Sequence, residues 1–107
     1  MSDNFISLQE AKELTKRYRD NFDNIATNDF KNSLSYSETF DADAIRALIE
    51  QPGCVSFRVY YGMKEDKKIC AILVGVNAQD QDILNGAESI IVEKGKICPP
   101  NCIDNPL

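Results

Sequence analysis

The sequence predicts a small α+β fold in which two amphipathic helices pack on an antiparallel sheet built around a central hairpin. Three patterns predict it. Apolar residues recur at helical spacing near the N-terminus and again after residue 41, and two strand-like runs, 54–63 and 68–77, flank a short polar segment. The chain has 107 residues, of which 43% are hydrophobic. This size and composition predict one domain over 1–107.

The first helix is predicted to run from Leu8 to Phe22. Ser7 and Glu10 form a capping box, in which the Ser7 hydroxyl accepts from the backbone N–H of Glu10 and the Glu10 carboxylate reaches back. Apolar residues then recur on one face, while the opposite face is charged. The apolar face holds Leu8, Ala11, Leu14, Tyr18 and Phe22.

A second helix is predicted to begin after Asp41, which is a favourable N-cap residue. It ends before Pro52-Gly53, because a proline disfavours helical geometry in the residue that precedes it. Its buried face holds Ala44, Ile45, Leu48 and Ile49. The polar segment 23–39 between the helices is either a mobile surface loop or contains a short strand in which Leu34 and Tyr36 alternate with polar residues.

The two strand-like runs are joined by Lys64-Glu65-Asp66-Lys67, which predicts a hairpin with a four-residue loop. This loop pairs Met63 with Lys68 and, farther along the strands, Tyr61 with Cys70. In this register eight apolar residues share one face, which we expect to be buried beneath the helices. They are Val55, Phe57, Val59, Tyr61, Cys70, Ile72, Val74 and Val76.

The second face of this hairpin holds the candidate interaction residues Arg58, Tyr60 and Leu73. An arginine beside an aromatic ring can hold a carboxylate or stack on a ligand, but an arginine that only packs on Tyr60 is the favoured interpretation. Ile69, Ala71 and Leu73 would form a patch too apolar to stay in water. We therefore expect Leu73 to be buried, either in a homodimer or larger assembly or beneath a C-terminal segment.

The four cysteines fall into two groups. Cys54 and Cys70 lie more than about 20 Å apart in the predicted hairpin, so they share neither a disulfide nor a metal, and Cys70 is a small core residue. Cys98 and Cys102 flank two prolines in Cys-Pro-Pro-Asn-Cys and are expected to lie close together in a surface loop. A structural role is favoured for this pair, while a redox pair and a soft-metal site, with Cys54 as third ligand, remain open.

The segment 77–86 is a polar connection, followed by a further predicted strand within Ser89–Glu93 and, at the end of the chain, a polar tail over 103–107. Clustered oxygens can bind calcium or magnesium, but the spacing here does not match an EF-hand loop. A solvated turn is favoured, and no metal or other cofactor is predicted. The acidic and amide side chains concerned are Asp80, Asp82, Asn85 and Glu88.

Composition excludes several classes of function. The net charge is −5, which argues against binding to nucleic acid or to an anionic membrane surface. The chain has no histidine, so a His-based catalytic triad or metal site is impossible. The N-terminus lacks a secretory signal, and the longest apolar run, 69–76, is too short to span a bilayer. These features predict a cytoplasmic protein, in which Cys98 and Cys102 rest as thiols.

Three segments resemble a family of small bacterial proteins found mainly in Bacteroidetes. They are Gln51-Pro-Gly-Cys-Val-Ser-Phe-Arg-Val-Tyr-Tyr-Gly62, Leu73-Val-Gly-Val-Asn77 and Cys98-Pro-Pro-Asn-Cys102. The resemblance covers most of the chain from Asp41 onward. It implies no activity, because none is known for that family.

Two functional hypotheses follow. The favoured one is a non-catalytic module that binds another protein or a small ligand and associates with itself, because the sequence shows no convergent carboxylate or nucleophile pair. The alternative is a thiol redox or metal-handling protein that uses Cys98 and Cys102.

Overall fold

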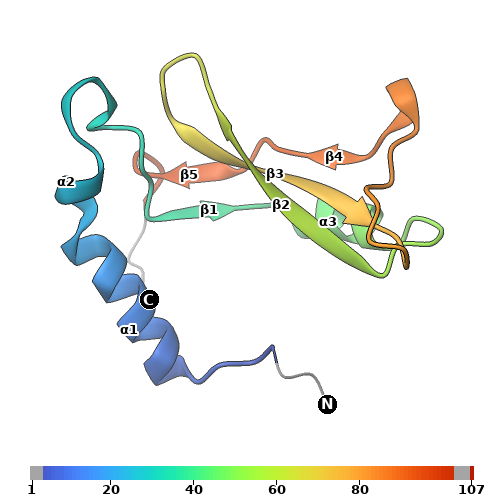
Figure 1. The fold of residues 1–107 in the computed structure, drawn as a ribbon, viewed down its shortest axis with the longest axis horizontal. Coiled ribbons are helices and arrows are strands. Elements are labelled where there is room, and N and C mark those ends of the chain that lie inside the picture. Colours follow the sequence, from blue (N-terminus) through green and yellow to red (C-terminus); the bar gives the residue numbers. More distant parts are fainter. Residues whose placement is uncertain (1–3, 103–106) are drawn as a thin grey trace.

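The α+β class is confirmed by a computed structural model, which describes residues 4–102 and 107. Two antiparallel sheets are present in the described part, one with the strand order β1-β5 and one with β2-β3-β4 (Figure 1). The elements are α1 (Leu8–Asp20), α2 (Phe22–Ile25), β1 (Ser37–Thr39), α3 (Ala42–Ile49), β2 (Ser56–Met63), β3 (Ile69–Val76), β4 (Ile91–Val92) and β5 (Lys96–Cys98), with short 3₁₀ turns at Asn28–Phe30 and Gly86–Glu88. The tail predicted over 103–107 lies largely outside the described residues.

Both predicted helix starts are confirmed. The Ser7 hydroxyl accepts from the backbone N–H of Glu10 at 3.0 Å, and the Asp41 carboxylate accepts from that of Ala44 at 3.1 Å. The first helix ends at Asp20, slightly earlier than predicted, and α2 continues the chain after Asn21. Within the segment 23–39, the short strand is present as β1.

Strand β3 is the central strand of the larger sheet. One of its edges pairs with β2, and the other pairs with β4 at Leu73 and Val74. On this second edge the backbone N–H of Ile69 also donates to Ser33 O at 2.9 Å, and that of Ala71 donates to the Glu38 carboxylate at 3.0 Å. These bonds join β1 and the chain before it to the hairpin.

The hairpin is present, but the predicted register is wrong by one residue. Met63 pairs with Ile69, and Tyr61 pairs with Ala71 rather than with Cys70. The loop is shorter than predicted because Lys67 adopts φ 71°. The backbone N–H of Lys64 donates to Lys68 O at 2.8 Å, which leaves a three-residue loop, a form that commonly ends in a left-handed residue.

The shift changes which residues share a face of the sheet, because side chains alternate between faces. Cys70 and Val74 are buried as predicted. Tyr61 and Phe57 now lie on the opposite face from them and are 81% and 46% exposed, so the predicted burial of both side chains is wrong.

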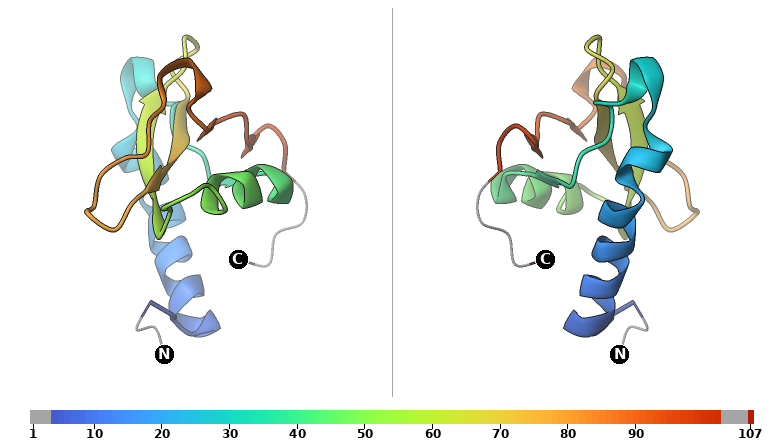
Figure 2. Two further views of the ribbon diagram at one scale, coloured as in Figure 1. Left: turned by 90° about the vertical axis from the view of Figure 1, so that its right-hand side faces the viewer. Right: turned by 90° about the vertical axis from the view of Figure 1, so that its left-hand side faces the viewer.

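The two longer helices differ in how much of their side-chain surface is buried against the rest of the chain. Helix α3 packs on the sheet through Leu48, which is fully buried, and Gln51 just beyond it lies against Gly75 of β3. Helix α1 extends away from both sheets and has no buried residue (Figure 2). It is anchored near its C-terminal end, where the Tyr18 hydroxyl donates to Ser35 O at 2.7 Å.

Candidate functional site

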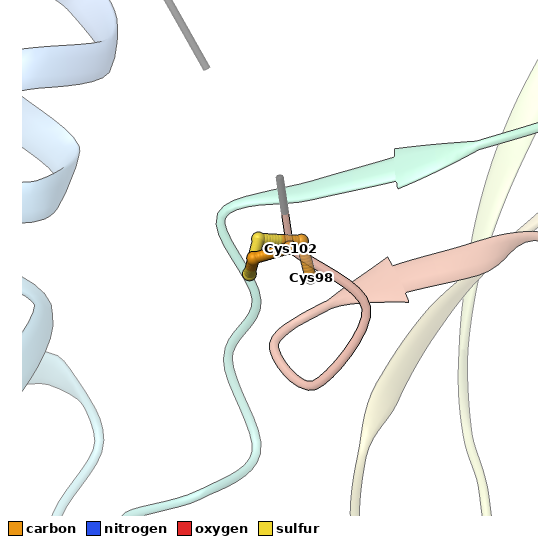
Figure 3. Close-up of a disulfide and its surroundings, with 2 residues drawn as sticks. All are labelled: Cys98 and Cys102. Carbon is orange, nitrogen blue, oxygen red and sulfur yellow. A yellow bond between two sulfur atoms is a disulfide. The ribbon is translucent and has the colours of Figure 1, made fainter. Parts of the chain in front are cut away.

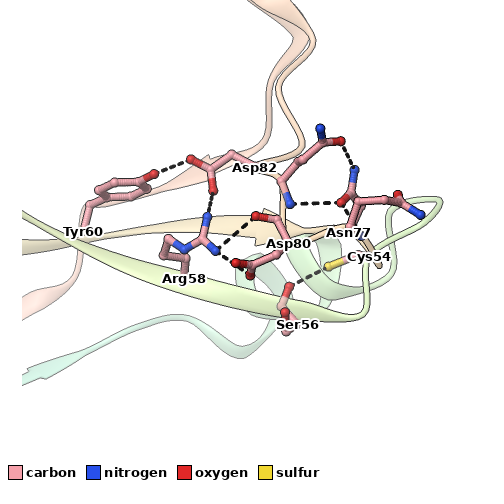
Figure 4. Close-up of polar contacts among 9 residues, drawn as sticks. Cys54, Ser56, Arg58, Tyr60, Asn77, Asp80 and Asp82 are labelled. Carbon is pink, nitrogen blue, oxygen red and sulfur yellow. Dashed lines mark hydrogen bonds and ion pairs between the residues drawn. The ribbon is translucent and has the colours of Figure 1, made fainter.

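The predicted residues Arg58 and Tyr60 do come together, with two acidic side chains around them (Figure 4). One terminal nitrogen of Arg58 contacts the Asp80 carboxylate at 2.7 Å, and the other contacts Asp82. The Tyr60 hydroxyl donates to the second oxygen of Asp82. We call these four residues the Arg58 cluster.

The turn between β3 and the cluster explains how the two carboxylates reach Arg58. The Asn77 side chain accepts from the backbone N–H groups of Gln79 and Gln81 at 2.9 and 3.0 Å, and Asp80 adopts φ 63°. Asparagine favours such turns because its short side chain can bond to the backbone two residues on. The acidic connection seen in the sequence therefore supplies counter-charges for Arg58.

The charged side chains of the Arg58 cluster are already paired with one another. The pKa of Arg58 is raised, first by its side-chain contact with Tyr60 and then by Asp82 and Asp80. The pKa of Tyr60 is raised because its hydroxyl donates to Asp82. Both terminal nitrogens of the Arg58 guanidinium already contact carboxylates. The cluster therefore connects the turn after β3 to β2, and neither nitrogen is left without a carboxylate partner to bind a ligand.

Leu73 is buried as predicted, with 4% of its surface exposed, but its own chain covers it. Val92 of β4 pairs beside it, and α3 packs on the same sheet. The apolar patch inferred from the sequence around Leu73 is therefore not open, and its burial needs no second copy of the chain.

Cys98 and Cys102 are joined by a disulfide at the end of β5, with a Cα–Cα distance of 4.7 Å (Figure 3). Their proximity is confirmed, whereas the predicted dithiol state is not the one found. The pair is also less superficial than predicted, because Cys98 is 7% exposed while Cys102 is exposed. No group of three metal-binding side chains occurs in the described residues, so Cys54 does not complete a metal site there.

A cavity of about 480 Å³ lies next to this disulfide. Thr15 and Arg19 of α1 line one side of it, and Tyr36 and Ser37 line another, together with the two cysteines. The disulfide is thus reachable from a space that combines a cationic side chain with an aromatic ring.

The two free cysteines differ in environment. Cys70 is buried, and burial raises the pKa of its thiol, which confirms its assignment as a core residue. The thiol of Cys54 is partly exposed and donates to Ser56 O at 3.1 Å.

Strand β2 carries an exposed apolar surface that the sequence interpretation missed. Four of its side chains point to the same face of the sheet, and each is between 40% and 81% exposed. They are Phe57, Val59, Tyr61 and Met63, and we call them the β2 edge surface. Val55 lies just before the strand, and its backbone N–H donates to Val76 O of β3 at 2.9 Å. The unbroken apolar run of β3 could have predicted this surface. Such a run is typical of a strand covered on both faces, which makes β3 the central strand and leaves β2 at the edge of the sheet.

The outer backbone edge of β2 is unpaired in the described part of the chain. The Lys64–Lys68 bond fixes which residues of β2 bond to β3, because bonded and non-bonded pairs alternate in an antiparallel ladder. The even-numbered residues therefore face β3. The backbone groups of the odd-numbered residues, Phe57 to Met63, point outward, and none of them bonds to another described residue.

Comparison with known protein families, curated protein sequences and solved structures finds no match. The resemblance to the Bacteroidetes proteins stays a prediction. Over the described residues, no helix has the length and apolar character needed to cross a membrane.

Proposed function

We propose that the protein is a non-catalytic interaction module that binds its partner through β2. The observation that carries this proposal is an edge strand of eight residues with an unpaired backbone edge and an exposed apolar face. Natural edge strands are usually short, charged or covered, because an open edge pairs readily with another chain. An extended segment added to β2 would gain backbone hydrogen bonds and bury alternate side chains.

The Arg58 cluster supports this proposal over the binding of a small acidic ligand. A ligand carboxylate at Arg58 would have to displace Asp80 or Asp82, which already contact it. Arg58 is also the only charged side chain of β2, and it is neutralised within the chain. A partner can therefore approach the strand without meeting an unpaired charge on it.

The proposal is tested by selecting binders from a random peptide library against the immobilised protein. We expect enriched peptides to carry apolar residues at every second position. Val59→Pro should weaken their binding at least about 10-fold, because it removes an outward N–H, whereas Val59→Thr should retain binding. Equal binding to both variants, or no enrichment, would contradict the proposal.

A second candidate function rests on the disulfide beside the cavity. We propose that Cys98 and Cys102 exchange with a substrate dithiol. One substrate thiolate attacks Cys102 Sγ, and Cys98 leaves as a thiolate. The second substrate thiol then displaces Cys102, which leaves an oxidised substrate and a protonated Cys98–Cys102 dithiol.

Loop length and exposure support this candidate. Closing a 15-residue loop stabilises a fold by about 3 kcal/mol, and a shorter loop contributes less. The Cys98–Cys102 pair encloses a short loop, with a sequence separation of 4, and Cys102 is exposed to attack. The bond is therefore worth little as a structural crosslink and is accessible to a thiol.

The redox candidate is tested by equilibration with glutathione buffers, using Cys102→Ser as the control that cannot form the bond. A reduction potential above about −250 mV would support exchange, and one below about −300 mV would mark a structural disulfide. The same value bears on the proposed cytoplasmic location, since a reducing cytosol opens only a disulfide of high potential.

A further inference from the structure

We infer that the partner of β2 is a second copy of the same chain, paired antiparallel across a two-fold axis that passes through Tyr60. This inference rests on the proposed function, because it names the partner that the β2 edge surface binds. The two three-stranded sheets would then form one continuous sheet with the order β4-β3-β2-β2-β3-β4. A two-fold interface of this kind uses the same surface on both copies.

The direction of the outer backbone groups limits the possible registers. Only odd-numbered residues of β2 offer outward N–H and C=O groups, so hydrogen-bonded pairs between copies must join odd residues. Two registers then overlap most of the strand: one with Val59 opposite itself, and one with Tyr60 opposite itself.

The apolar side chains favour the register centred on Tyr60. In this register Phe57 lies opposite Met63 of the second copy, and Val59 lies opposite Tyr61, so every member of the β2 edge surface meets another member. In the register centred on Val59, Met63 would instead face Val55, which lies before the strand and whose N–H is turned toward β3. Cross-strand pairs of aromatic and β-branched residues stabilise sheets by about 0.2–1 kcal/mol each.

Charge does not oppose this arrangement, although the chain carries a net charge of −5. Arg58 lies opposite Gly62 of the second copy, and its guanidinium is already paired with Asp80 and Asp82. At the end of the strand, Lys64 lies opposite Ser56 and Glu65 lies opposite Val55. No two like charges therefore face each other across the new pair of strands.

The available area suits a reversible dimer. Aromatic side chains bury up to about 150–250 Å² each, so the four half-exposed members of the β2 edge surface leave on the order of 400 Å² open per chain. A symmetric pair would bury on the order of 800 Å², an area typical of weak, transient interfaces. We therefore expect association that depends on concentration in the micromolar range.

The test is sedimentation velocity over a range of micromolar concentrations. The wild-type chain should pass from monomer to dimer, and Val59→Pro should remain monomeric. Proline is tolerated at this position because the Val59 N–H points outward and does not bond to β3. Val59→Thr, which keeps the N–H, and Ile25→Asp, which changes an exposed apolar residue on α2, should both dimerise like the wild type.

Val59→Lys is a second variant in case the proline variant does not fold. It keeps the backbone N–H but places an ammonium group opposite Tyr61 in both symmetric pairs, so its dimer should weaken at least about 10-fold, because a charge replaces an apolar contact. A wild-type chain that stays monomeric at all concentrations, or a dimer that survives in both Val59→Pro and Val59→Lys, would overturn the inference.

The register is tested by oxidative cross-linking in a Cys54→Ser background. Tyr60→Cys should cross-link to itself, because directly opposite residues in a non-hydrogen-bonded pair lie about 4.5 Å apart, within the range of a disulfide. Cross-linking through Val59→Cys but not through Tyr60→Cys would overturn the register.

The peptide selection separates the two proposals. A monomeric wild-type chain that still selects peptides dependent on the Val59 N–H would exclude the second copy while leaving strand addition in place. If neither peptides nor a second copy depend on Val59, both proposals are wrong.

Discussion

Strands β2 and β3 have the same length and pair with each other throughout, yet they differ in burial. Strand β3 holds Leu73, Val74 and Val76 in the core, whereas much of β2 is exposed. The difference in burial arises from their neighbours. Strand β3 pairs with β4 as well as β2, and α3 packs on it, while β2 has one edge without a partner in the described residues. Burial in this hairpin is thus set by position in the sheet rather than by the hydrophobicity of each strand.

The largest expected effect on stability comes from truncating one large apolar side chain to alanine on each strand. Leu73→Ala should lower the free energy of unfolding by about 2–5 kcal/mol, because it leaves a cavity in the core. Phe57→Ala should cost less than about 2 kcal/mol, because the side chain is already half exposed. Urea unfolding at dilute concentration measures both, and equal losses would break the comparison.

Thiol reactivity provides the next contrast. Cys70 of β3 is buried with a raised pKa, while Cys54, just before β2, is partly exposed. Brief alkylation of the folded protein should therefore label Cys54 about 10- to 100-fold faster than Cys70. Mass spectrometry of the digested protein reports each site, and equal labelling would show that β3 is not protected.

A smaller effect is expected where the turn after β3 is fastened to β2. Asp82 contacts both Arg58 and Tyr60, whereas Asp80 contacts Arg58 from a largely exposed position. Asp82→Ala should therefore speed amide exchange in the turn about 10-fold, and Asp80→Ala should speed it less than about 2-fold. Equal effects of the two changes would mean that the Tyr60 contact does not hold the turn.

The smallest effect is a dependence on alkaline pH. Because the pKa of Tyr60 is raised in the folded chain, its contribution to stability is complete below the ordinary tyrosine value of about 10 and is lost as the pH rises through the folded value. Tyr60→Phe should flatten the dependence of the free energy of unfolding on pH in this range. A titration of stability from neutral to alkaline pH checks this sign.

Local rules predicted the local features of this fold. Ser7 and Asp41 cap the helices because their oxygens match unpaired backbone N–H groups, and such pairs are visible in the sequence. The class of the fold and the hairpin follow equally from periodicity.

The register could not be predicted in the same way. The register depends on the left-handed backbone conformation of Lys67, and lysine is not a residue type that predicts this conformation. An error of one residue in the register moves every side chain to the other face of the sheet. The sequence predicted that Arg58 lies near Tyr60 and Cys98 near Cys102, but it predicted neither the carboxylates that pair with Arg58 nor the disulfide. Asp80 and Asp82 contact Arg58 because the turn after β3 folds back over β2. The spacing of Cys98 and Cys102 does not predict whether the pair is oxidised.

Residue-resolved hydrogen exchange of dilute protein tests the open edge of β2 most directly. Within this one strand, the amides of Arg58, Tyr60 and Gly62 should be protected by β3, while those of Phe57, Val59 and Tyr61 should exchange rapidly. Uniform protection along β2 at low concentration, or protection of the odd-numbered residues alone, would contradict both the register and the free edge.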